Sequence, residues 1–141
     1  MFEKTTDVER RLHQWRQVRH TSTCEQDVLD AFSQIKILPR YLDYWTPKDW
    51  PNAFEILENG YFCATGIAIL LYQTLGNLKY LNPHETSWKV ISNHVTGNDG
   101  AVFITNGRMY NLNPERSVSL TDAEDLHITL IDYKDLFLPL I

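Results

Sequence analysis

Residues 63–76 read CATGIAILLYQTLG, and this stretch decides the fold. It is apolar on nearly every side, which is typical of a helix buried at the centre of a domain. Gly60 lies just before it and favours the left-handed backbone that ends a preceding helix. Gly76 is expected to end the buried helix in the same way.

An amphipathic helix is predicted over residues 8–19. Apolar residues recur there every three or four positions behind Asp7, a residue type that caps helices. Most of the arginines lie off the apolar face, so we expect them to form a solvated surface. These arginines are Arg10, Arg11, Arg16 and Arg19.

Two further helices are predicted before the central one. Ser22 and Glu25 form a capping box, which indicates a helix that ends before Pro39. Pro51 is a favoured first helical residue and indicates a short helix up to Asn59. Between them, residues 37–50 are aromatic and irregular, as expected of a segment laid over a core or a cleft wall.

Strands are predicted only after the central helix. Residues 88–92 and 101–105 are short β-rich runs, and Asn106-Gly107 is the strongest local signal for a two-residue hairpin. The chain then returns over residues 108–113, and residues 126–133 give another strand. Helices followed by strands predict an α+β domain with a mostly antiparallel sheet.

Composition is that of an ordinary globular protein, with 43% hydrophobic and 22% charged residues among 141. The net charge of −5 makes nucleic-acid binding an unfavoured function. No apolar stretch approaches the roughly 20 residues of a membrane span, and the charged start does not resemble a signal peptide. We therefore expect a cytoplasmic protein without a membrane partner.

The two cysteines, Cys24 and Cys63, make no disulfide framework and match no paired metal spacing. No cofactor or metal is therefore expected. Cys63 would stand at the N-terminus of the buried helix, where unpaired amides and the helix dipole favour a thiolate. Those amides could also hold an oxyanion. The competing interpretation is a small buried hydrophobic residue, the common role of a free cysteine.

The sequence around Cys63 resembles the nucleophile region of transglutaminase-like cysteine peptidases, in the papain-like superfamily. The resembling residues are Tyr44-Trp45-Thr46-Pro47, Phe54-Glu55-Ile56-Leu57, Gly60, Cys63 and the apolar run to Gly76. The predicted hairpin and Asn111-Leu112-Asn113-Pro114 are similar to the hairpin that carries the superfamily's histidine and its orienting residue. The resemblance implies the fold of that superfamily, with the Cys63 helix packed against an antiparallel sheet.

The resemblance also implies a thiol nucleophile, a base and a residue that orients the base. Cys63 matches the nucleophile, and Asn113 or Asn111 matches the orienting residue. In the predicted hairpin Gly100 faces Asn113, so the family's histidine position falls at Gly100, which cannot act as a base. His94, in the glycine-containing segment before it, is the candidate replacement.

Other functions compete with a thiol enzyme. The chain could be a degenerate relative that keeps the scaffold and binds a partner through its cleft or its basic first helix. His94-Val95-Thr96 and His127-Ile128-Thr129 both match the His-x-Thr pattern of two-histidine phosphoesterases, in which imidazoles act as acid and base. The first motif runs into a glycine-containing segment instead of a strand, which disfavours that alternative.

The sequence therefore predicts one domain over residues 1–141, with a helical N-terminal part (1–35) and a transglutaminase-like core (44–114). The favoured function is a thiol-dependent amide hydrolase or acyl transferase that acts on a protein or peptide. The alternative is a degenerate scaffold that binds or inhibits a protein partner. The sequence does not define the oligomeric state.

Overall fold

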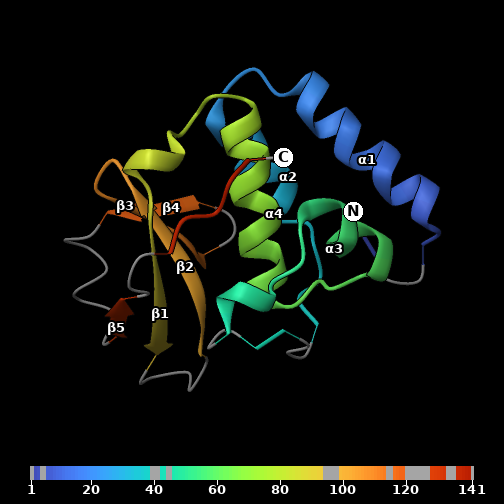
Figure 1. The fold of residues 1–141 in the computed structure, drawn as a ribbon. Helices are drawn as coiled ribbons and strands as arrows, with labels where there is room; N and C mark the ends of the chain where they lie inside the picture. Colours follow the sequence, from blue (N-terminus) through green and yellow to red (C-terminus); the bar gives the residue numbers. More distant parts are fainter. Residues whose placement is uncertain are drawn as a thin grey trace.

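The central helix is α4 (Ala64–Asn77), which stands between two layers in the computed structural model (Figure 1). On one side it contacts the strands β2 (Asp99–Thr105) and β3 (Arg108–Asn113). On the other it contacts the helices α2 (Glu25–Phe32) and α3 (Ala53–Asn59). Residues 65–76 are all buried, which confirms a helix that is covered on every side.

The structure describes residues 2–3, 6–38, 42–43, 46–93, 99–113, 116–119, 128–132 and 136–140. For residues 92–93, 99, 111–113, 116–119 and 128–132 it describes the backbone alone. Within these ranges, no helix has the length and apolarity needed to cross a membrane.

The sheet has five strands in the order β4-β3-β2-β1-β5, and every pairing is antiparallel. The predicted α+β class with an antiparallel sheet is therefore confirmed. Strand β4 is the one strand of the sheet that the sequence did not predict. The elements not yet given are α1 (Val8–Thr21), η1 (Pro47–Asp49), η2 (Pro83–Glu85), β1 (Ser87–Asn93), β4 (Arg116–Ser119) and β5 (Ile128–Asp132).

Helix α1 begins where the sequence predicts. The Asp7 side chain accepts a hydrogen bond from the Arg10 amide at 2.9 Å and so caps the helix. Trp15 is buried and its indole N–H donates to the hydroxyl of Thr74 at 2.8 Å. Because Thr74 belongs to α4, this bond fixes the first helix to the central one.

The arginines of α1 do not form one solvated face, and the prediction is wrong for Arg11. Its side chain is 4% exposed, and its guanidinium donates to the Glu58 carbonyl at 3.0 Å. Arg19 is half-buried over the ring of Trp15 at 4.2 Å, and burial, followed by the charge of Arg16, lowers the pKa of Arg19. Arg10 and Arg16 are exposed, as predicted.

The predicted capping box of Ser22 and Glu25 is wrong. Helix α1 continues to Thr21, so Ser22 becomes its C-cap, and Cys24 is the N-cap residue of α2. Asp27 instead accepts bonds from the amide and hydroxyl of Thr23, each at 2.9 Å. These bonds, the backbone one first, lower the pKa of Asp27.

Helix α3 begins two residues later than predicted. Asn52 is its N-cap and forms a reciprocal capping box with Glu55, while Pro51 precedes the helix. Gly60 closes it in the left-handed conformation with φ of 71°, as predicted.

The two glycines inside α4 have different roles. A Cβ on Gly66 would lie 1.9 Å from the Tyr61 carbonyl oxygen, so only glycine admits this backbone. A Cβ on Gly76 would meet Leu140 Cδ2 at 2.3 Å. The prediction that Gly76 ends the helix is wrong, because α4 runs on to Asn77 and Gly76 makes room for Leu140.

The C-terminal residues 136–140 lie along α4. Tyr72 donates its hydroxyl to the Leu138 carbonyl, and Gln73 donates its side-chain amide to the Pro139 carbonyl at 3.0 Å. Burial raises the pKa of Tyr72 to about 12, so this hydroxyl keeps its proton across the physiological range.

The predicted hairpin forms at Asn106-Gly107. Both residues have positive φ, 54° and 73°, which is the backbone of a type I′ turn. Thr105 pairs with Arg108, and the register continues through Phe103 and Tyr110, as the sequence predicted for a two-residue loop.

Replacing Gly107 with valine tests the turn. No atom lies within 4 Å of a Cβ at this position, so the effect comes from the backbone alone. A β-branched residue at positive φ should lower the free energy of unfolding by about 1–2 kcal/mol. Thermal unfolding followed by circular dichroism measures the loss. Gly107→Asn is the matched control and should lose less, because asparagine tolerates this conformation; equal stability of valine and wild type would contradict the turn.

A pair of substitutions tests the contact between Tyr61 and α4. Gly66→Ala should destabilise the protein by about 3 kcal/mol, at the upper end of overpacking effects, because a backbone carbonyl blocks the methyl group. In Gly76→Ala the obstacle is the end of a leucine side chain, which can move, and alanine gains about 0.5–1 kcal/mol of helix propensity. Urea unfolding of the two variants should therefore separate them, and equal losses would argue against the Tyr61 contact.

Candidate thiol site at the start of the central helix

Cys63 is the N-cap residue of α4, at the helix start that the sequence predicts. Its Sγ accepts a hydrogen bond from the Gly66 amide at 3.4 Å, the bond that a serine or aspartate would accept in other helices. The sulfur therefore lies at the N-terminus of a buried helix, which is the positive end of the helix dipole. The side chain is 0% exposed, so a substrate reaches it only if covering residues move.

The segment that leads to Cys63 is held by its backbone. The Tyr61 amide donates to the Ile56 carbonyl at 3.1 Å, and the Phe62 amide donates to the Gly60 carbonyl at 2.9 Å. The Phe62 carbonyl in turn accepts from the Leu38 amide at 2.9 Å. These bonds tie the approach to Cys63 to α3 and to the chain after α2, so the position of the sulfur is fixed from both sides.

Strand β2 passes next to the start of α4. A Cβ on Gly100 would lie 3.6 Å from the Cβ of Ala64, the residue that follows Cys63. The position at which the resemblance expects a histidine is thus close to the thiol-bearing helix turn, and it holds a glycine. The contact is an ordinary van der Waals distance, so a larger side chain has room for its first carbon.

The remaining predicted site residues are not placed relative to Cys63. His94 lies outside the described residues, as does the other histidine of the phosphoesterase alternative, His127. Thr129 of the second His-x-Thr motif is in β5, where the structure describes the backbone alone. Asn111 and Asn113 are in β3, but the structure describes only their backbone. The expected facing of Val102 with Asn111 and of Gly100 with Asn113 lies beyond the part of β2 and β3 whose pairing the structure describes, and it stays a prediction.

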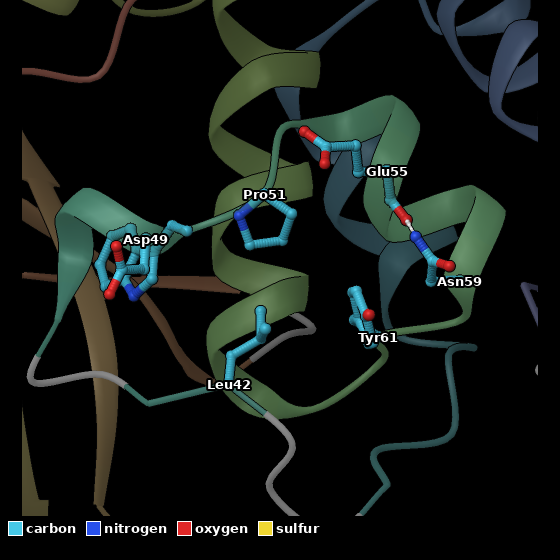
Figure 2. Close-up of a pocket in the computed structure, with 7 residues that line it drawn as sticks. Leu42, Asp49, Pro51, Glu55, Asn59 and Tyr61 are labelled. Carbon is cyan, nitrogen blue, oxygen red and sulfur yellow. Dashed lines mark hydrogen bonds between the residues drawn. The ribbon is translucent and has the colours of Figure 1, made fainter.

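A pocket of about 320 Å³ adjoins the start of α4, and the sequence did not predict it as a site (Figure 2). The aromatic, irregular composition of residues 37–50 was the signal for a cleft wall, and Trp50 does form part of this one. The pocket is lined by Leu42, Asp49, Trp50, Pro51, Glu55, Asn59 and Tyr61.

Two of the lining residues also touch the first turn of α4. The Tyr61 carbonyl packs against Gly66, and Leu42 Cδ1 would lie 3.6 Å from a Cβ on that glycine. The pocket lining therefore contacts the helix turn that holds the thiol, because the amide of the same Gly66 donates to Cys63 Sγ.

The fold is similar to that of a solved protein, LapG of Legionella pneumophila. The calcium-bound LapG structure has a TM-score of 0.68 and 14% sequence identity, and the match covers 95% of this chain and 81% of that one. A second LapG structure gives a TM-score of 0.64 with the same identity and coverage. The sequence itself matches no family model and no curated protein.

Calcium is part of the first LapG structure. In the part of this chain that the structure describes, no group of three or more His, Cys, Asp or Glu side chains could hold a metal ion. At 14% identity, the likeness to LapG shows the architecture alone. The chain has the transglutaminase-like fold.

Proposed function

We propose that this chain is a thiol-dependent amide hydrolase or acyl transferase of the transglutaminase-like type, with Cys63 as its nucleophile. The observation that carries the proposal is the position of the sulfur in a LapG-like fold. Cys63 is the N-cap residue of a buried helix, and its Sγ accepts a hydrogen bond from the Gly66 amide. A helix N-terminus stabilises the thiolate, the form of cysteine that attacks a carbonyl carbon.

The proposed mechanism uses His94 as the base, with Asn113 or Asn111 orienting its imidazole. The imidazole takes the thiol proton, and Cys63 Sγ adds to the amide carbonyl carbon. The C–N bond then breaks as the imidazolium returns its proton to the leaving amine, which leaves a thioester on Cys63. Water completes hydrolysis, or a second amine completes acyl transfer, and either one restores the thiol.

A degenerate scaffold is the second candidate, and Gly100 is the observation that favours it. In the predicted hairpin register Gly100 takes the superfamily's histidine position and leaves it without a base, and Gly100 lies beside Ala64. Such a protein would bind its protein or peptide partner through the cleft or through α1. Arg10 and Arg16 are then the exposed α1 residues to change, because Arg11 is buried by contacts with the rest of the fold.

Removing the nucleophile and the base tests the enzyme. Cys63→Ala and His94→Ala should each abolish release of fluorescent peptides from labelled casein, and also the incorporation of a fluorescent amine into casein. The double variant should match the single ones, because a nucleophile and its base act as one unit. Cys24→Ala is the matched control and should keep full activity, since this cysteine is exposed at the start of α2. Turnover that survives in Cys63→Ala would exclude a thiol mechanism.

Placing a histidine at position 100 separates the two candidates. If His94 is the base, Gly100→His should leave casein turnover at or below the wild-type rate, as should Gly100→Phe, a control of similar size that has no base. The reason is that His94 already takes the thiol proton, so a second imidazole has no proton to transfer. A gain of about 100-fold in Gly100→His alone, within the range that a general base contributes, would instead show a scaffold that lacks its base.

A further inference from the structure

The pocket beside α4 has preformed aromatic walls. Trp50 donates its indole N–H to the Asp43 carbonyl at 3.0 Å, and its ring meets Trp88 edge to face at 5.3 Å between centroids. Trp88 is 2% exposed, so Trp50 rests on the core. The Trp50 ring is therefore fixed in place by contacts with the rest of the fold. Tyr61 also lines the pocket, and its backbone carbonyl lies against Gly66.

The pocket lining is acidic and aromatic. Among the described residues, Asp49 and Glu55 are the charged residues of the lining, and neither lysine nor arginine is part of it. Glu55 is occupied, because its carboxylate accepts the Asn52 amide at 3.2 Å in the capping box of α3. Asp49 is exposed, and none of the described side chains bonds to its carboxylate.

These features favour a cation. A carboxylate and an indole that line one pocket both attract a cationic group, the first through its charge and the second through the ring quadrupole. A planar guanidinium uses both interactions better than an ammonium does, since it stacks on aromatic rings and donates in pairs to a carboxylate. The volume of about 320 Å³ lies within the range of small-ligand pockets, about 300–1,000 Å³.

We propose that this pocket binds an arginine side chain of a peptide, with the guanidinium between Trp50 and the Asp49 carboxylate. The role of the pocket as a substrate subsite rests on the proposed function. Its position fits that role, because Leu42 and Tyr61 line the pocket and also lie against Gly66 in the first turn of the Cys63 helix. A peptide anchored here runs past the helix start, which makes arginine-containing peptides the preferred substrate class.

Titration of N-acetyl-arginine amide into the full chain tests the pocket directly. The readout is the indole N–H signal of Trp50 in a two-dimensional nitrogen–proton NMR spectrum, assigned by its loss in Trp50→Phe. We expect a saturable shift of this signal, and binding at least about fivefold weaker for N-acetyl-citrulline amide, which has a similar shape and no charge.

Two charge variants complete the test. Asp49→Asn should weaken arginine binding by about three- to tenfold and leave citrulline binding unchanged. Glu58→Gln is the matched control, because it removes one exposed carboxylate of α3 that does not line the pocket, and it should bind like wild type. Equal binding of arginine and citrulline, no effect of Asp49→Asn, or an unmoved Trp50 signal would each overturn the proposal.

The titration also distinguishes failure of the pocket from failure of the enzyme. It is repeated with Cys63→Ala, which should bind arginine amide as wild type does. Arginine binding in a protein that never turns over casein would count against the proposed thiol chemistry and leave the pocket in place. Turnover of casein without arginine binding would count against the pocket alone.

Discussion

The carbonyl oxygen of Tyr61 lies against the bare Cα of Gly66, and the start of the central helix depends on that approach. This close contact brings the segment after α3 against the first turn of α4. Cys63 is then the N-cap residue, and its sulfur accepts a hydrogen bond from the Gly66 amide. The same approach sets Tyr61 at the edge of the pocket. One residue without a side chain thus supports both the position of the thiol and a wall of the neighbouring cavity.

Local signals in the sequence predicted the elements that depend on local physics. The Asp7 cap, the run of apolar residues after Cys63 and the Asn106-Gly107 turn each act within a few residues, and each is confirmed. The predicted ends of other helices were wrong where distant contacts decide. Gly76 resembles a helix stop because glycine ends helices, but its real constraint is Leu140, which packs there from the far end of the chain.

In the candidate site, too, the feature set by local sequence was predicted and the feature set by distant contacts was not. The position of Cys63 followed from the pattern of one helix, whereas the pocket is built from residues spread between Leu42 and Tyr61 that meet only when the chain folds back on itself. Burial of Arg11 was missed for the same reason. Its partners include the Glu58 carbonyl at the end of α3, which no helical periodicity within α1 could indicate.

A buried thiol beside an open pocket constrains how a substrate could reach it. A ligand shifts an equilibrium only by its preference for one state, so anchoring in the pocket exposes Cys63 only if the anchored peptide binds better when the cover is displaced. Tyr61 is the residue able to couple the two events, because it lines the pocket and its carbonyl lies on the helix turn that bonds to Sγ. Interactions made only after opening would then raise the rate as well as the affinity. In a scaffold without a base, a peptide anchored in the same pocket would bind but would not be cleaved.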